Sequence, residues 1–311
     1  MASKVTIITP IYNGERFIDQ YISSLLQQTY NNVELIIVND GSTDRTLDLC
    51  EKKKVLLEQK GWKIQILSQA NKGAASAVNT ALKKVSGDYI MLFDVDDILM
   101  PDNISSKALF LDMHPEYGMV RNNGYMVFED DLNNTNIPLV KNDKEKQNEW
   151  IFDDLVYAYT NNWPGTFMVR FSFFHSLHPD LEIYTSQYGQ NLQLMLSVAW
   201  FYKTGFIDSY LTKYIIYKRS HSHSDNPMRL HELQIGYIQN RIGIIEKMNI
   251  PKKKKTFYLN YLQKKILREN INWQLHLKNR KKEIILSIKD CLAAGYLPIR
   301  TVLKAIWYVL G

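Results

Sequence analysis

The sequence predicts an α/β protein whose first part is a mainly parallel sheet flanked by helices. Strand-like apolar runs alternate with segments of helical periodicity over roughly the first 120 residues, which is typical of βαβ units. Three of these runs end in polar segments, at Pro10, Asp40 and Asp94. From Pro227 onward the pattern stays helical. We therefore expect an α/β domain over residues 1–226 and a helical C-terminal extension over residues 227–311.

The predicted elements follow one another at short intervals. The predicted strands span residues 5–9, 33–38, 63–67, 89–93, 166–170 and 210–217. The predicted helices span residues 17–26, 47–55, 74–85 and 191–200, and the C-terminal helical region is interrupted near residues 251, 279 and 295–298. Residues 129–149 are rich in Asn, Asp and Lys, so we expect a mobile loop there.

Composition excludes several classes of protein. The 311 residues, 45% of them hydrophobic, are enough for a sizeable core. The two cysteines, Cys50 and Cys291, are far apart and lack metal-ligand spacing, so we expect no disulfide framework. No apolar run approaches the ~20 residues that span a bilayer, and the N-terminus lacks a signal-peptide pattern. These features predict a cytoplasmic protein that is not integral to the membrane.

The net charge of +6 is distributed unevenly. From residue 227 onward there are 17 Lys and Arg against 5 Asp and Glu, whereas the first 226 residues are net acidic. A basic helical tail is compatible with a solvated face, an anionic membrane surface or nucleic acid. Because no nucleic-acid reader motif occurs, we expect no nucleic-acid partner.

Three carboxylates follow the apolar run at residues 89–93, namely Asp94, Asp96 and Asp97. Crowded carboxylates repel one another unless a cation lies among them, and hard oxygen ligands select Mg²⁺ or Mn²⁺. Strand ends of open α/β sheets are also where ligands bind. The alternative is an acidic turn before a helix that begins near Pro101. Dinucleotide and P-loop sites are disfavoured, since the sequence has neither GxGxxG after its first strand nor a Walker motif.

Four ordered motifs, at residues 9–15, 38–44, 71–79 and 94–97, resemble those of the family 2 nucleotide-sugar glycosyltransferases in order and spacing. The resemblance is strong over residues 3 to about 120, looser to residue 226 and absent from the helical tail. It implies the Rossmann-like GT-A fold, a sugar-nucleotide donor in the cytoplasm, a divalent cation and inverting transfer to an acceptor hydroxyl.

The resemblance also implies roles for individual residues. Pro10 and Tyr12 would flank the nucleobase, and Asp40 would accept a hydrogen bond from it. Asn13 and Glu15 would support the wall that Pro10 and Tyr12 form beside the nucleobase. Lys72 would lie near the base or ribose, and Asn79 would brace its loop. Asp94 would face the ribose and the metal. Asp96 would hold the Mn²⁺ or Mg²⁺ that bridges the diphosphate. Each motif also has an ordinary alternative, since such residues commonly form turns and strand ends.

Two departures from the family pattern concern chemistry. Val78 stands where many members have Arg. Gln190 and Asn191 stand where the family often has Glu-Asp with the Asp as general base, and an amide cannot accept a proton near neutral pH. We expect Gln190 and Asn191 to orient substrate in the catalytic site, with a helix N-cap at Asn191 as the alternative. Asp97 and Glu182 are then the candidate bases.

His221 and His223 are further candidates for the metal site. They lie beside Lys218 and Arg219 in a Ser-rich stretch, where imidazoles suit metals and cations suit phosphates. The resemblance implies that such a segment closes over the diphosphate.

Together with these features, the resemblance implies a metal-dependent inverting glycosyltransferase with a UDP-sugar donor. The acceptor would be a saccharide or lipid-linked saccharide in capsule, exopolysaccharide or lipopolysaccharide assembly. The tail has an apolar stripe that is suited to lying on a membrane surface. The alternative is that this stripe packs onto the domain or onto a second subunit, as in a homodimer. The stripe comprises Ile299, Val302, Leu303, Ile306, Trp307 and Leu310. A catalytically weakened nucleotide-sugar or glycan-binding module is the alternative function.

Overall fold

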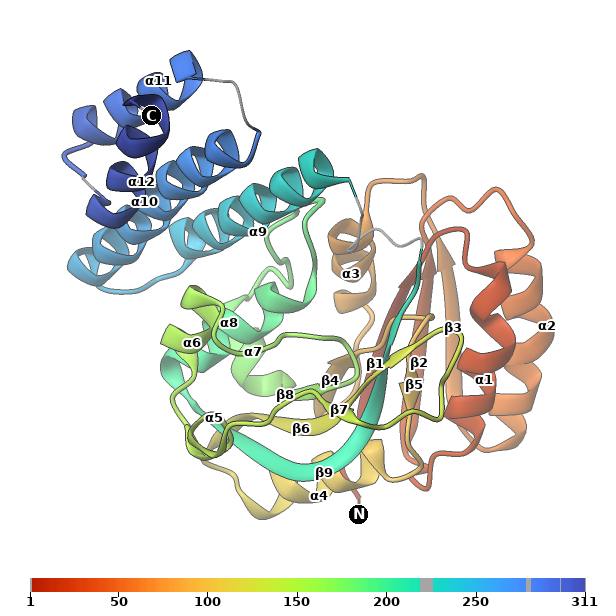
Figure 1. Cartoon of the computed structure of the whole chain (residues 1–311). Helices are drawn as coiled ribbons and strands as arrows, with labels where there is room; N and C mark the ends of the chain where they lie inside the picture. Colours follow the sequence, from red (N-terminus) through yellow and green to blue (C-terminus); the bar gives the residue numbers. More distant parts are fainter. Residues whose placement is uncertain (1, 219–225, 278–280, 297, 311) are drawn as a thin grey trace. The chain divides into compact units, whose positions relative to one another are not determined.

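The computed structural model describes residues 2–218, 226–277, 281–296 and 298–310. The chain divides into two compact units, Met1–Ser220 and His221–Gly311, and each is described by itself. The first unit contains the sheet and the second contains only helices among its described residues (Figure 1).

The first unit begins with four parallel strands, as predicted. They are β1 (Val5–Ile11), β2 (Val33–Asn39), β3 (Lys63–Ser68) and β4 (Tyr89–Leu92), in the spatial order β3-β2-β1-β4. The helices that connect them are η1 (Glu15–Phe17), α1 (Ile18–Leu26), α2 (Thr46–Gln59) and α3 (Ala74–Leu82). Every residue of β1, β2 and β4 is buried, which is why their sequences are nearly continuous apolar runs.

The sheet continues beyond β4 with strands of both directions, so the whole sheet is mixed. The order after β4 is β8-β6-β9-β5, where β8 (Phe167–Arg170) runs antiparallel to both β4 and β6 (Tyr117–Phe128). β9 (Lys203–Ile216) runs parallel to β6. The short strands are β5 (Ile98–Leu99) and β7 (Ile137–Pro138), and the helices are α4 (Asn103–Met113), α5 (Asp143–Gln147), α6 (Phe152–Tyr157), α7 (Phe171–Leu177) and α8 (Asn191–Phe201).

Several of these elements differ from the prediction. β6 was not expected, because polar residues interrupt its apolar pattern. β9 begins at Lys203, seven residues before the predicted strand, because its first half is recruited by β6. Residues 129–149, expected to be a mobile loop, contain β7 and α5. Asn142 caps α5 by accepting a hydrogen bond from the Lys144 amide at 2.9 Å, which is a local signal of a helix start.

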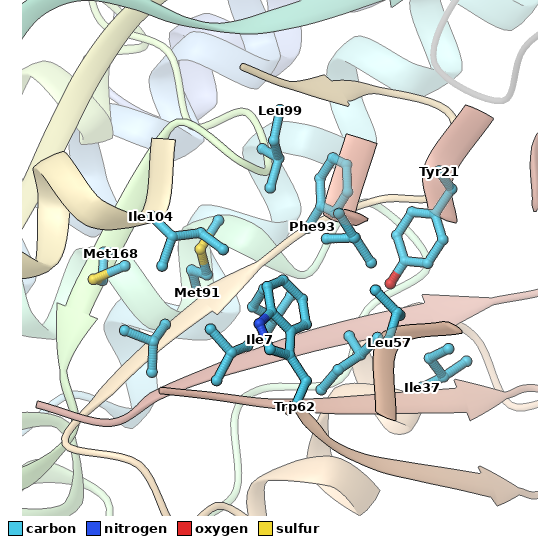
Figure 2. Close-up of a cluster of buried hydrophobic side chains, with 14 of the residues drawn as sticks. Ile7, Tyr21, Ile37, Leu57, Trp62, Met91, Phe93, Leu99, Ile104 and Met168 are labelled. Carbon is cyan, nitrogen blue, oxygen red and sulfur yellow. The ribbon is translucent and has the colours of Figure 1, made fainter. Parts of the chain in front are cut away.

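The main hydrophobic core lies against the parallel strands, and part of it is drawn in Figure 2. Tyr21 of α1 stacks on Phe93, which follows β4, with ring centroids 5.2 Å apart. The Thr9 hydroxyl donates to the Phe93 carbonyl at 2.8 Å and lies 2.7 Å from the Tyr21 hydroxyl. This buried contact fixes the ends of β1 and β4 side by side, where the acidic loop begins.

The second unit consists of α9 (Pro227–Lys247), α10 (Lys252–His276), α11 (Lys281–Ala293) and α12 (Ile299–Leu310). Its small core joins α10, α11 and α12 and comprises Ile271, Ile284, Cys291, Val302 and Ala305. Among the described residues, no helix combines the length and apolarity needed to cross a membrane.

The apolar stripe predicted on α12 is divided between two faces. Val302 is 6% exposed and packs inward, whereas Ile299, Leu303, Ile306 and Trp307 are exposed. Val302 therefore belongs to the small core of this unit and not to the exposed face. The side chain of Leu310 lies outside the described part of the structure.

Candidate functional site

The acidic loop, residues 93–97, leaves the carboxyl end of β4 at the edge where β1 and β2 also end. The Phe93 amide donates to the Ile8 carbonyl at 3.1 Å, which keeps the start of the loop on the sheet. Asp94 and Asp96 are half-buried. Burial, followed by the charge of Asp96, raises the pKa of Asp94 to about 8, and a hydrogen bond from Gln190 opposes that rise. The loop thus holds carboxylates close together at the strand end, as the sequence predicts.

Gln190 reaches the acidic loop from the start of α8. Its Nε2 lies 3.2 Å from Asp94 Oδ1 and 3.3 Å from Asp94 Oδ2. Gln190 is the N-cap residue of α8 but makes no capping hydrogen bond through its side chain, and Asn191 is the first helical residue. The alternative of a capping Asn191 is therefore wrong. The buried Oδ1 of Asn191 accepts no hydrogen bond from the residues that the structure describes.

Asp97 faces the other way, into the sheet. It is 2% exposed, and its Oδ1 accepts a hydrogen bond from the Ile215 amide of β9 at 3.0 Å. Burial, and then the charge of Asp96, raises the pKa of the Asp97 carboxyl well above its usual range. Proton transfer by Asp97 stays a prediction, and this geometry favours a role in positioning the loop. Tyr217 adds a second tie, because its hydroxyl donates to the Asp96 carbonyl at 2.9 Å.

Asp40 follows β2 and organises the loop after β3. Its Oδ1 accepts from Gln69 Nε2 at 2.8 Å and from the Lys72 amide at 3.0 Å, and its Oδ2 accepts from the Gly73 amide at 2.8 Å. A carboxylate has about four lone-pair sites, so about one is left unused, although Asp40 is only 3% exposed. Gln69 was missed by sequence reasoning, although its position just before the motif at residues 71–73 was a usable signal.

The two residues predicted to support the nucleobase wall join the loop after β1 to the loop after β2. Asn13 has φ +48°, and its Oδ1 accepts from the Thr43 amide at 2.8 Å. Glu15 Oε2 accepts from the Arg45 amide at 3.0 Å. Of the predicted wall itself, Pro10 is buried in β1 and Tyr12 is 46% exposed. The exposed Tyr12 ring is available to a planar ligand.

The remaining predicted donor residues lie on or before α3. Lys72 is exposed at the helix start. Asn79 braces a distant segment, because its amide exchanges two hydrogen bonds with the Ile183 backbone at 3.1 and 2.7 Å. Glu182 pairs with Lys83 at 2.8 Å, and Lys83 caps the far end of this nine-residue helix. Since such a helix is about 14 Å long, Glu182 is far from the Lys72 end, and its role as a base stays a prediction.

No group of three His, Cys, Asp or Glu side chains within the described ranges is arranged to hold a metal ion. Asp94 and Asp96 of the acidic loop supply two carboxylates, and their role as metal ligands stays a prediction. His221 and His223, the other predicted ligands, lie outside the described residues. Mg²⁺ is commonly held by only one or two carboxylates together with substrate phosphates, so this donor set fits such a cation when a diphosphate is bound.

Comparison with known sequences gives a family match. The model of the family described as "Glycosyl transferase family 2" matches residues 6–177. The putative glycosyltransferase EpsE of Bacillus subtilis is 36% identical to this chain over 127 residues, which cover 41% of this chain and 45% of EpsE. The chain spans less than half the length of the first curated relatives that it matches.

Solved structures resemble the chain over nearly its whole length. S. aureus TarS 1–349, in complex with UDP-GlcNAc, has a TM-score of 0.63 at 20% identity, covering 98% of this chain and 89% of that chain. The mannosyltransferase PcManGT from Pyrobaculum calidifontis, in complex with GDP-Man and Mn²⁺, has a TM-score of 0.57 at 17% identity, covering 97% and 79%. At these identities the likeness concerns the fold alone.

Proposed function

This chain belongs to glycosyl transferase family 2, and we propose that it is a metal-dependent inverting enzyme that transfers a sugar from a UDP-sugar to an acceptor hydroxyl. Its GT-A fold brings the acidic loop and the Asp40 loop to one edge of the sheet. The observation that carries the proposal is the pair Asp94 and Asp96 at the carboxyl end of β4, with Gln190 held against Asp94. Ligands of open α/β sheets bind at this edge.

The donor site is proposed to lie over β1 and β2. The nucleobase would pack against the exposed Tyr12 ring, next to the buried Pro10, and donate to the remaining acceptor site on Asp40. Asn13 and Glu15 fix this wall through the Thr43 and Arg45 amides, and Asn79 fixes the segment at Ile183. The nucleotide sugars bound by TarS and PcManGT support a nucleotide-sugar donor. Lys72 is free of ion pairs among the described residues and suits the ribose or phosphate side.

Asp94 and Asp96 are the proposed ligands of Mn²⁺ or Mg²⁺. A bound divalent cation would act as a Lewis acid that neutralises charge on the diphosphate leaving group. The residues of the chain position that site: Gln190 orients Asp94, and Asp97 and Tyr217 hold the loop against β9. His221 and His223 stay predicted ligands.

The proposed acceptor is a saccharide, carried on a lipid in capsule, exopolysaccharide or lipopolysaccharide assembly. The exposed residues Ile299, Leu303, Ile306 and Trp307 of α12, together with the basic tail, support contact with an anionic membrane surface. On this proposal the enzyme works in the cytoplasm, at the inner face of the membrane. A second copy of the chain is the alternative occupant of this apolar face.

The proposal is tested by calorimetric titration of UDP-, GDP- and CDP-sugars into the full chain with Mn²⁺, with Mg²⁺ and with EDTA. We expect a UDP-sugar to bind only when the cation is present. Asp96→Ala should lose this cation-dependent binding. Asp48→Ala, which removes an exposed carboxylate of α2, is the matched control and should bind as the wild type does. Binding unchanged by both EDTA and Asp96→Ala would contradict the metal site.

Turnover separates the enzyme from a weakened nucleotide-sugar or glycan-binding module. The enzyme should release nucleoside diphosphate from the donor, slowly with water and faster with an acceptor. A chain that binds the donor with a cation but never releases the diphosphate is a binding module.

A further inference from the structure

Two aromatic side chains from different parts of the chain stack next to the acidic loop. The rings of Trp163 and Tyr214 have centroids 4.7 Å apart and planes within 8° of parallel. Both residues are half-buried, so each keeps some exposed surface. We call Trp163 and Tyr214 the aromatic platform. Neither residue has a part in the donor site proposed above.

The platform is tied through the backbone to both ends of the acidic loop. Gly165, two residues after Trp163, donates its amide hydrogen to the Leu92 carbonyl at 2.7 Å, just before the loop. Ile215, directly after Tyr214, donates to Asp97 Oδ1 at 3.0 Å. Each ring therefore belongs to a residue no more than two positions from a backbone amide that is hydrogen-bonded to one end of the acidic loop.

The segment that carries Trp163 is held rigidly. The Gly165 carbonyl accepts hydrogen bonds from Lys107 Nζ at 2.7 Å, Asn103 Nδ2 at 3.1 Å and Thr212 Oγ1 at 3.1 Å. Gly165 has φ +72°, and a Cβ there would come within 2.8 Å of Leu99 Cδ2. Only glycine is therefore accommodated well. Such a preformed surface binds a ligand at a low cost in ordering.

The order of strands separates the platform from the donor site. Asp40 follows β2, which lies on one side of β4 beyond β1, whereas Trp163 precedes β8, which lies on the other side of β4. A donor whose nucleobase lies at Asp40 and whose diphosphate lies at Asp94 would therefore point its sugar toward the platform. The acceptor must approach that sugar from the side opposite the diphosphate, so the acceptor is the molecule best placed to contact the platform.

We propose that the aromatic platform binds a pyranose ring of the acceptor by stacking against its apolar C–H face. This inference rests on the proposed glycosyltransferase function and specifies its acceptor as a saccharide with a ring next to the reacting hydroxyl. Aromatic surfaces with a few convergent polar groups are typical of small-molecule sites. Here the rings would hold the apolar face, and polar groups around the acidic loop would be left for the hydroxyls.

Saturation-transfer NMR on the full chain tests the platform directly. The probes are the methyl α- and β-glycosides of glucose, galactose, N-acetylglucosamine and rhamnose, with UDP and diamagnetic Mg²⁺ present. At least one should receive saturation at its ring C–H protons, and Trp163→Ala should reduce that signal about 10-fold or more. Trp163→Phe should restore most of it, since a ring remains.

The matched control is Tyr210→Ala. Tyr210 stacks on Tyr125 with centroids 4.3 Å apart and planes within 5°, and it is 40% exposed, but it lies four residues before Tyr214 on β9. This variant should keep the glycoside signal.

Diphosphate release from the donor is measured on the same protein preparations, in separate samples that contain a UDP-sugar and the cation but no glycoside. Trp163→Ala should leave that rate within about two-fold of the wild type. The platform proposal is overturned if Trp163→Ala keeps the glycoside signal, or if no glycoside gives a signal while donor hydrolysis proceeds. If the wild type does not hydrolyse the donor at all, the proposed function is overturned instead.

Discussion

Gln190 Nε2 lies within 3.3 Å of both carboxylate oxygens of Asp94, which joins the start of α8 to the acidic loop after β4. Family resemblance places a carboxylate pair at residues 190–191, yet here the first of these residues donates a hydrogen bond to a carboxylate. A Glu at this position would bring a second negative charge against Asp94. The amide is therefore suited to orienting Asp94 without repelling it.

The first prediction concerns this contact. Gln190→Ala should lower kcat/KM for donor turnover by about 5- to 150-fold, because a buried hydrogen bond of about 1–3 kcal/mol is lost. Gln190→Glu should be no better than Gln190→Ala, since it adds repulsion. Gln27→Ala, at an exposed position after α1, is the control. A rate gain in Gln190→Glu would mean that the native site lacks a competent base.

The second prediction concerns Asp40, whose carboxylate accepts from the amides of Lys72 and Gly73. Asp40→Asn replaces one acceptor oxygen by an NH₂ group that faces backbone donors. We expect a loss of about 1–3 kcal/mol in the free energy of unfolding, together with weaker UDP binding. Urea denaturation and calorimetry measure the two effects. Unchanged stability would show that the carboxylate does not hold this loop, and Asp48→Asn provides the control.

The third prediction concerns Glu34, a buried carboxylate on β2. Its oxygens accept from Lys63 Nζ at 3.0 Å, Thr6 Oγ1 at 2.9 Å, Gln65 Nε2 at 3.1 Å and the Ser86 amide at 3.0 Å. Burial alone would raise the pKa of Glu34, but the interactions with Lys63, Ser86 and Thr6 outweigh it, and the net direction is down.

A folded-state pKa below the unfolded value of about 4.3 makes folding more favourable at high pH. The contribution of Glu34 is complete above that unfolded value and is lost as the pH falls through the lower folded one. Glu34→Gln should cost about 1–3 kcal/mol at pH 7, and its difference from the wild type should narrow under acid conditions. Urea denaturation across pH measures this difference. The control is Glu51→Gln, at an exposed site on α2, which should change the free energy of unfolding little. If the difference in that free energy between Glu34→Gln and the wild type does not change with pH, the prediction is wrong.

The fourth prediction concerns the outward face of α12. Ile306→Asp combined with Trp307→Asp should weaken binding to liposomes that contain acidic lipid, while the chain stays folded, because both side chains are exposed. Wild-type binding should rise with acidic lipid and fall with salt, since basic residues near such a surface contribute about 1 kcal/mol each. Flotation measures this.

The control for α12 is Leu109→Asp combined with Met113→Asp, which alters two exposed apolar residues of α4. It should bind liposomes as the wild type does. Equal flotation of the α12 variant and the wild type, with loss of a dimer in the variant, would assign the face to a second copy of the chain.

The first four strands and the acidic loop could be predicted from the sequence because each is a local pattern. A strand buried on both faces needs a continuous apolar run, and the carboxylates of the loop follow one such run directly. β6 and the first half of β9 could not be predicted in this way. Their pairing is long-range, and β6 contains buried polar residues, Asn122 and Asn123, whose partners lie elsewhere in the sequence.

The roles of single site residues were less predictable than their identities. A sequence motif marks Asp40 and Asp97 but cannot say that their oxygens accept from the Gly73 and Ile215 amides. Such partners depend on which loops the sheet brings together. In the same way, helical periodicity finds apolar residues on α12 but cannot separate Val302, which packs inward, from the exposed Trp307.

The most direct test of the proposed function is the release of nucleoside diphosphate from a UDP-sugar by the full chain with Mn²⁺. We predict release by the wild type and by Asp48→Ala, and loss of release with EDTA and in a variant carrying Asp94→Ala with Asp96→Ala. If that double variant stays folded and releases diphosphate as fast as the wild type, the acidic loop is not the catalytic site.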